Sequence, residues 1–224
     1  MKIRKLQYNI GYSHILSFKD EYKQIIPKIF SFEKVRYQIE NQNTVDENIR
    51  IIFKNENIAF FLSKNSLSFV FEGDISKLKK NNIYLDLFWD VYEDIKIFNG
   101  YSKTLRHVIV AHAVEIINSS DIDPIEKNTD FLKKNPFGEL SDFAVTYEFS
   151  KNETDYRFIF GNFGQSDIKK YELTPFNSNY NKDLFDNVGF MCELNALQSE
   201  KSVSFTKFKN LLKDSEKIII SFNN

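Results

Sequence analysis

The fold is indicated most directly by residues 49–72, IRIIFKNENIAFFLSKNSLSFVFE. Apolar residues alternate with other residues in three successive runs, and a period of two places one face of a β-strand against a core. The alternating positions are Ile49, Ile51 and Phe53, then Ile58, Phe60 and Leu62, then Leu67, Phe69 and Phe71. Polar segments that contain Asn, residues 54–57 and 63–66, separate the runs and suit tight hairpin turns. The stretch therefore predicts an antiparallel meander.

The hydrophobic period changes directly after the meander. Helical spacing relates Tyr84, Phe88, Val91, Tyr92, Ile95 and Phe98, and Asn99-Gly100 then supplies a C-terminal stop. The following run, Thr104 to Ile117, has apolar residues on both faces, which is typical of a central strand covered on both sides. A helix and a central strand are therefore expected after the meander.

The two ends of the chain add further elements. A strand is expected near Ile3 to Ile10, and an amphipathic helix from Tyr22 to Phe30 is interrupted by Pro27. In the second half, residues 143–160 form an alternating pair around a turn at 151–154, and residues 188–194 form another strand. Ser204 is expected to cap a short helix, and residues 217–222 to close the chain as a strand.

These elements predict an α+β protein built around an antiparallel sheet. Each half has hairpins, a helix and a strand, so the sheet is expected to consist of two hairpin-helix-strand units, which suggests a duplication. The expected organisation is an N-terminal unit over residues 1–118, a linker over 119–141 and a C-terminal hairpin-strand-helix-strand unit over 142–224. The linker contains Pro124, Pro136 and Gly138. Both units are expected to share one compact body.

Composition favours packing surface over residues that carry bond-making chemistry. The 224 residues include 23 Phe and 11 Tyr but only 3 His, 1 Cys and 7 Gly. The net charge of -1 provides no overall field that would attract nucleic acid or an anionic membrane. No apolar run is long enough to span a bilayer, and the first residues lack the apolar segment of a secretory signal. We therefore expect a cytoplasmic protein with no membrane partner.

The order of elements resembles a sporadically distributed bacterial family of similar length that is uncharacterised. The resemblance covers about the first half of the chain. It rests on the helix ending at Ile29-Phe30, on residues 36–39 (RYQI) and 67–69 (LSF), and on the strand that opens near Arg106. The Arg-Tyr-Ile-Asn type of ending in that family is replaced here by residues 107–112, HVIVAH. The resemblance implies the fold and adds no activity.

The histidines and the cysteine do not form a recognisable site. His107 and His112 lie five residues apart, which puts them on opposite faces of a strand, and His14 stands alone. Cys192 alternates with apolar neighbours and is expected to be an inert core residue that forms no intrachain disulfide. No catalytic residue, metal site or cofactor is therefore predicted.

Two further segments carry weak signals for chemistry. Asp121, Asp123 and Glu126 could supply carboxylates for a divalent cation, but they lack the glycine and spacing of a calcium loop. Residues 161–166, GNFGQS, contain glycine but match neither a P-loop nor a dinucleotide fingerprint. Solvated linker carboxylates and a turn after a strand account for both segments.

Two places are candidates for binding. The segment from 169 to 182 combines cations with aromatic rings, the ingredients of single-stranded nucleic-acid binding, although a surface loop is the favoured interpretation. Its residues are Lys169, Lys170, Tyr171, Phe176, Tyr180 and Lys182. Trp89 falls outside the main apolar stripe of its helix, so it is a candidate anchor for a protein partner as well as a candidate for burial.

Three functions follow in order of preference. The first is a non-enzymatic binding or assembly module that contacts another protein in a bacterial multi-protein system, with phage defence as one setting. The second is an RNA-binding or single-stranded DNA-binding protein that uses the segment 169–182. The third is a metal-dependent enzyme with dispersed carboxylates. The first is preferred because no nucleophile motif, metal set or phosphate loop is present.

The second hypothesis makes a direct prediction. Replacing Lys169, Lys170 and Lys182 together with Ala should abolish strongly salt-dependent binding of single-stranded RNA or DNA, because each lysine that neutralises a phosphate releases a counterion. Fluorescence anisotropy with an oligonucleotide over a series of salt concentrations measures this effect. Unchanged binding by the triple variant contradicts the hypothesis.

Overall fold

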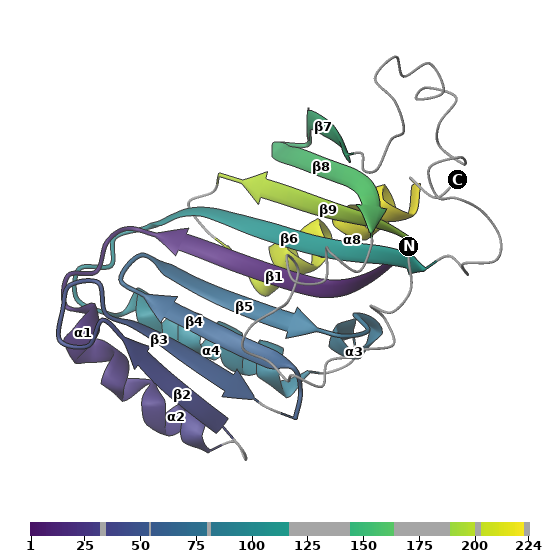
Figure 1. The fold of residues 1–224 in the computed structure, drawn as a ribbon. Coiled ribbons are helices and arrows are strands. Elements are labelled where there is room, and N and C mark those ends of the chain that lie inside the picture. The colour runs from purple at the N-terminus through teal and green to yellow at the C-terminus, as the bar shows by residue number, and fades with distance from the viewer. Residues whose placement is uncertain are drawn as a thin grey trace, which may run out of the picture.

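The structure is a computed structural model that describes residues 1–31, 35–53, 55–79, 82–116, 144–163, 189–199 and 203–221. Within these ranges nine strands form one antiparallel sheet in the order β2-β3-β4-β5-β1-β6-β9-β8-β7 (Figure 1). The strands are β1 (Lys2–Tyr12), β2 (Val35–Glu40), β3 (Asn48–Phe53), β4 (Ile58–Ser63), β5 (Ser66–Glu72), β6 (Thr104–Ile116), β7 (Ala144–Lys151), β8 (Thr154–Phe163) and β9 (Gly189–Gln198). The helical segments are α1 (Phe18–Glu21), a 3-10 turn at Tyr22–Gln24, α2 (Ile26–Phe30), α3 (Ser76–Lys79), α4 (Ile83–Lys96) and α8 (Phe205–Ser221).

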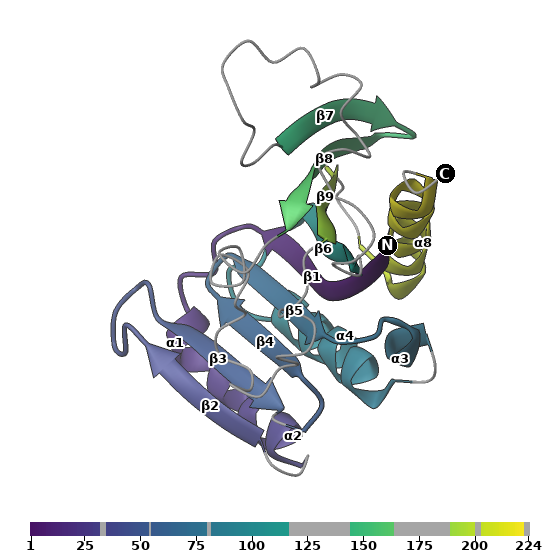
Figure 2. The ribbon, with the colours of Figure 1, turned by 45° about the vertical axis from the view of Figure 1, so that its right-hand side comes forward.

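Helices α4 and α8 lie on the same side of the sheet (Figures 1 and 2). We call this side the helix face and the opposite side the polar face. Each strand turns its alternate apolar residues to the helix face, as Leu6, Tyr8 and Ile10 do in β1, and all three are buried. Burial of these side chains between the sheet and the helices removes apolar surface from water and stabilises the two layers.

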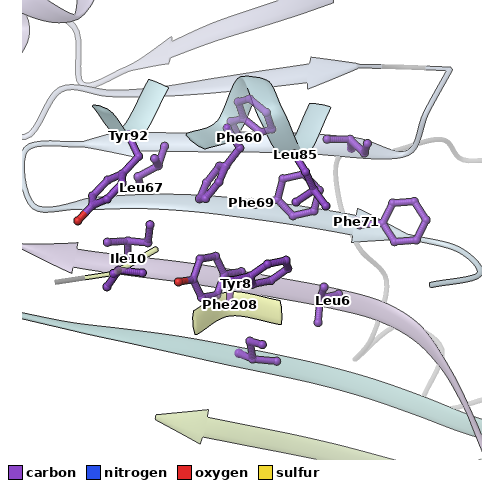
Figure 3. Packing of buried hydrophobic residues seen from close by; sticks show 14 of the residues in the cluster. Leu6, Tyr8, Ile10, Phe60, Leu67, Phe69, Phe71, Leu85, Tyr92 and Phe208 are labelled. Atoms are coloured by element: carbon purple, nitrogen blue, oxygen red, sulfur yellow. The ribbon is translucent and has the colours of Figure 1, made fainter. Parts of the chain in front are cut away.

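Aromatic rings join the two layers at the centre of the sheet (Figure 3). Tyr8 of β1 lies 6.0 Å from the ring of Phe88 in α4 and 4.7 Å from that of Phe208 in α8, measured between ring centroids. Phe88 also packs edge-on against Phe60 and Phe69, each at 5.6 Å. Phe88 is fully buried, so it holds α4 against three neighbouring strands.

Helix α4 has the boundaries that local sequence signals favour. The Asn82 side chain accepts hydrogen bonds from the backbone N–H groups of Tyr84 and Leu85, at 3.0 and 3.3 Å, and so caps the first turn. Gly100 follows the helix with a φ of 93°, a conformation that favours glycine. The helix predicted over residues 84–98 is confirmed.

The hairpin of β7 and β8 is closed by a tight two-residue turn. Asn152 and Glu153 both have positive φ, at 51° and 60°, and lie between the paired residues Lys151 and Thr154. A two-residue turn in which both central residues have positive φ has a backbone twist that matches the right-handed twist of the flanking strands. The turn predicted at 151–154 is confirmed, as is the meander of β3, β4 and β5.

Two predicted elements differ in the structure. The N-terminal helix is split into α1, a 3-10 turn and α2, with Pro27 in the first turn of α2, because proline has no N–H group to donate within a helix. The predicted strand at 217–222 is wrong for its described residues, because α8 continues to Ser221. The buried positions Leu211, Ser215 and Ile219 recur every four residues, so a helix buries them where a strand would separate them.

The sequence-based fold class is confirmed at the level of an antiparallel sheet with helices. The second half has the order hairpin, strand, helix, because α8 replaces the predicted final strand. Pairing of β6 with β9 joins the two predicted units in one sheet. The predicted linker, 119–141, lies outside the described residues, so the division at 118 and 142 stays a prediction.

Strand β6 occupies the predicted central position but its two faces differ. Ile109, Ala111 and Ala113 are buried beneath the helices, whereas Val108 and Val110 are half-buried on the polar face. The described helices all lie on the other side (Figure 2). Where placement is described, none of the helices has the length and apolar content that crossing a lipid bilayer requires.

Replacing Phe88 with Ala should lower the free energy of unfolding by about 3–5 kcal/mol. The change removes a buried ring that packs against Tyr8, Phe60 and Phe69 of the sheet. Urea denaturation followed by circular dichroism measures the loss. Ile97 is 81% exposed at the end of the same helix, so Ile97→Ala is the control and should change stability by less than about 0.5 kcal/mol. Equal effects of the two changes would contradict this account of the core.

Candidate binding face of the sheet

The polar face of the sheet carries hydrophilic residues at its centre. In β1 these are Lys5, Gln7 and Asn9, which alternate with the buried residues of the helix face. Strand β5 adds Ser66 and Ser68, which pair with Gly11 and Asn9 of β1. The alternation that buries one half of each strand therefore places these hydrophilic residues on the other half, where Ala59 and Val70 are also buried.

A pocket of about 370 Å³ opens on this surface across β1, β5 and β6. Its lining consists of Gln7, Asn9, Gly11, Asn65, Ser66, Ser68, Arg106 and Val108. We call it the Arg106 pocket. Its volume lies at the small end of the range usual for ligand sites, about 300–1,000 Å³. Three amides, two hydroxyls and one guanidinium provide its polar groups.

The strand register places Arg106 in this pocket. Arg106 of β6 pairs with Gly11 of β1, and a Cβ atom added at Gly11 would lie 3.2 Å from the Cγ atom of Arg106. The absence of a side chain at Gly11 therefore lets the Arg106 side chain lie across β1. Arg106 is exposed and has no hydrogen bond or ion pair to any residue in the described ranges.

The other polar groups of the pocket are partly engaged with one another. Gln7 Nε2 donates to Asn9 Oδ1 at 2.9 Å, which fixes the direction of both amides. At the end of the pocket, Ser63 Oγ donates to Asn65 Oδ1 at 3.0 Å. The Gln7 carbonyl oxygen and the Asn9 NH₂ group remain available, so this part of the pocket can both accept and donate hydrogen bonds.

Charged residues form a row across four neighbouring strands at the far end of the polar face. The strand register pairs Lys5 of β1 with Glu72 of β5 and with His112 of β6, and His112 with Glu193 of β9. Lys5 and His112 therefore lie side by side in the row, with one glutamate at each end. We call these four residues the charged row.

Hydrogen bonds organise one end of the charged row. Glu193 Oε2 accepts from His112 Nε2 at 3.3 Å, and Glu193 Oε1 accepts from Asn195 Nδ2 at 2.8 Å. The bond from His112, supported by that from Asn195, lowers the pKa of Glu193 to about 2. Glu193 is therefore an ionised acceptor at neutral pH.

Glu72 lies in a different environment at the other end of the row. It is 1% exposed, and neither carboxylate oxygen has a hydrogen-bond partner within the described chain. Burial raises the pKa of Glu72 to about 8, although the positive charge of Lys5 opposes the shift. Burial also lowers the pKa of Lys5, while Glu72 and Glu193 raise it. The row therefore contains one carboxylate that is largely protonated at neutral pH.

The two strand histidines lie on opposite faces of β6, as predicted. His112 belongs to the charged row, whereas His107 is fully buried on the helix face, where its Nδ1 atom lies 3.0 Å from the Tyr8 hydroxyl. Burial lowers the pKa of His107 to about 4, so it is neutral at physiological pH. His107 is thus a core histidine.

Cys192 occupies the predicted core position. It is fully buried on the helix face of β9, and burial raises the pKa of its thiol to about 12. A thiol with this pKa is a poor nucleophile at neutral pH. No three His, Cys, Asp or Glu side chains gather as metal ligands in the part of the chain that the structure describes.

The sequence-predicted binding residues lie elsewhere. Trp89 is part-buried between α4 and α8, with its ring 6.0 Å from Tyr8 and 6.1 Å from Phe205. Its role as a partner anchor stays a prediction, although the ring also contributes to the core. The nucleic-acid candidates, Lys169, Lys170, Tyr171, Phe176, Tyr180 and Lys182, lie outside the described residues. The carboxylates Asp121, Asp123 and Glu126 also lie outside them.

Comparison of the chain with protein-family models and with curated proteins finds no match. Function is therefore inferred from the chemistry of the polar face. Sequence reasoning missed both the Arg106 pocket and the charged row, because their members are distant in the chain. The available signal was the polar alternation of Gln7, Asn9 and Gly11 beside that of Ser66 and Ser68.

Because Glu72 is buried, the stability of the folded protein should depend on pH. Its carboxyl ionises near 4.5 when unfolded and near 8 when folded, so the folded state holds the extra proton between these values. Stability should therefore fall as pH rises from about 4.5 to 8. Replacing Glu72 with Gln should remove this loss and make the variant more stable than the natural protein by roughly 2–4 kcal/mol at pH 9, with little difference at pH 4.

Urea denaturation at a series of pH values gives the difference curve. Glu153 is exposed in the β7–β8 turn, so Glu153→Gln is the matched control and should follow the natural protein. A flat difference curve for Glu72→Gln contradicts the buried carboxyl.

Proposed function

We propose that this protein is a non-enzymatic binding module that receives a carboxylate of a protein partner in the Arg106 pocket. The observation that carries the proposal is the charge of the pocket. Arg106 is the single charged residue among the described residues that line the pocket, and its guanidinium is unpaired within the described chain. A binding partner with one negative charge would complete the site.

A carboxylate fits the pocket better than other anions. The planar guanidinium group of Arg presents parallel N–H donors that match the two oxygens of a carboxylate. The described lining residues include no second cation, so one carboxylate balances their charge whereas a dianionic phosphate would not. Within the part of the lining that the structure describes, there is also no aromatic ring on which a nucleic-acid base could stack.

The neutral part of the pocket favours a peptide. The amides of Gln7 and Asn9 lie next to each other on β1 and offer both donors and acceptors, the groups that a peptide backbone also has. Ser66 and Ser68 add hydroxyls from the neighbouring strand β5. An extended acidic segment could therefore place its carboxylate at Arg106 and its backbone along the β1 amides.

The other functions predicted from the sequence remain predictions. Nucleic-acid binding by residues 169–182 and metal-dependent catalysis by Asp121, Asp123 and Glu126 stay predictions, since these residues are outside the described ranges. Participation in a bacterial multi-protein system, with phage defence as one setting, is likewise a prediction. None of these enters the carboxylate proposal.

The test uses matched peptides. Two pools of random hexapeptides with blocked ends, one with a fixed Asp and one with a fixed Asn, are titrated into isotope-labelled protein and followed by NMR. The Asp pool should shift the side-chain amide signals of Gln7, Asn9 and Asn65, and the Asn pool should not. Arg106→Ala should weaken binding of the Asp pool about 10- to 100-fold, the effect of losing a charged hydrogen-bonding partner.

Arg36 provides the control, because it is an exposed arginine on the edge strand β2 of the same sheet. Arg36→Ala should bind the Asp pool like the natural protein. Gly11→Ala should weaken binding as well, since the added methyl group displaces the Arg106 side chain. Equal shifts from both pools, or unchanged binding by Arg106→Ala, would overturn the proposal. Stronger binding of inorganic phosphate than of acetate would contradict the choice of a carboxylate.

A further inference from the structure

The helix layer has a groove on the side of the molecule opposite the Arg106 pocket. A hollow of about 520 Å³ lies among α3, α4 and α8. Its apolar lining includes Leu78 of α3, Leu85 of α4 and Leu212 of α8, all nearly buried. We call it the α4–α8 groove. It lies over the joint between the two main helices, where the Trp89 ring is 6.1 Å from that of Phe205.

A stripe of lysines follows the α8 side of the groove. Lys209, Lys213 and Lys217 line it and recur every four residues, so they project from one side of the helix. All three are exposed. Lys213 has no hydrogen bond or ion pair to a described residue, and Lys209 lies over the Phe205 ring at 4.1 Å. Glu216 is the only carboxylate among the lining residues that are described.

A stripe of acids runs along α4, the helix whose Leu85 lines the groove. Asp86, Asp90 and Glu93 are exposed and recur at intervals of four and three residues, the spacing of one helix face. Glu93 forms an ion pair with Lys96, while Asp86 and Asp90 have no partner in the described chain. The buried residues Phe88, Val91 and Ile95 occupy the opposite side of α4, so the acids point away from the sheet.

Exposed isoleucines accompany both charged stripes. Ile83 is 58% exposed at the start of α4, and Ile220 is 57% exposed near the end of α8. Ile220 also lines the groove. The surface therefore combines an apolar hollow, large exposed aliphatic side chains and two rows of opposite charge. Such a combination is unusual for a surface that contacts only water.

We propose that this surface binds a second copy of the same chain, with α8 of each protomer lying against α4 of the other. A two-fold axis that runs along the α4–α8 groove exchanges the two sides of the groove. It therefore brings the lysine stripe of each protomer to the acid stripe of its partner, twice in one interface. A two-fold axis across the groove would instead place acids on acids and lysines on lysines.

A second copy is a better occupant than an unrelated acidic segment. An acidic helix would pair with the lysines but would leave Asp86 and Asp90 without partners, whereas a second copy satisfies both stripes. The apolar hollow and the exposed Ile220 from each protomer would then meet near the axis and lose water contact together.

The size of the helices limits the strength of the dimer. Helix α4 has 14 residues and is thus about 21 Å long. Neighbouring helices lie roughly 8–10 Å apart, so a two-helix surface is near the small end of specific interfaces. The dimer should therefore dissociate on dilution, and high salt should weaken it because the charges are exposed.

Sedimentation velocity at several protein and salt concentrations provides the test. The natural chain should shift from monomer to dimer as its concentration rises at low salt. Lys213→Glu alone and Asp90→Lys alone should each raise the dimer dissociation constant at least about tenfold, because each homodimer then contains two like-charge contacts. Lys19 is exposed on α1, so Lys19→Glu is the control and should behave like the natural chain.

Mixing the two variants gives the decisive result. In a heterodimer of Lys213→Glu with Asp90→Lys both contacts are again between opposite charges, so the mixture should dimerise although neither variant does so alone. This restoration also shows that both variants are folded. A natural chain that stays monomeric at all concentrations, or a mixture that does not dimerise, overturns the proposal.

Discussion

The packing of α4 and α8 against one face of the sheet is the constraint on which the rest of the structure depends. The ring of Tyr8 in β1 packs against Phe88 of α4 and against Phe208 of α8 at the centre of the core. Figure 3 shows Tyr8 beside Phe208. Because this contact fixes which face of every strand is buried, it also fixes which residues are displayed on the other face. A shift of one residue in the register of β1 would exchange Tyr8 with Gln7 or Asn9.

The two faces of the sheet consequently have different chemical roles. The helix face contains the titratable groups whose function is structural, such as His107 and Cys192, and burial suppresses their ionisation. The polar face contains groups that can bind. Arg106 stays exposed and unpaired among the described residues, while Glu72 is the exception, a carboxylate whose burial opposes its ionisation. The pocket that we propose for a partner carboxylate thus lies on the face that the described helices do not cover.

Two separate surfaces of the molecule are suited to contact with protein. The Arg106 pocket is small, polar and singly charged, which favours recognition of one side chain of a partner. The α4–α8 groove combines apolar residues with the lysines of α8, and exposed acids run along α4, a combination that favours the proposed self-association. Because one lies on the polar face and the other in the helix layer, a dimer formed through the helices would leave both polar faces accessible and would present two pockets to a partner (Figure 2).

The sequence by itself determined the elements whose patterns are local. The period of two in residues 49–72 specified the meander, and the helical stripe of α4 with the Asn99-Gly100 stop specified the first long helix, because neighbours in the chain supply these signals. The sequence could not distinguish helix from strand at Ile218, Ile219 and Ile220, since an unbroken apolar run fits both. Strand order was decided only by the tertiary structure, because pairing of β1 with β5 and β6 joins distant segments. That pairing brings Arg106 to Gly11 and Lys5 between Glu72 and His112, so both candidate sites exist only in the folded chain.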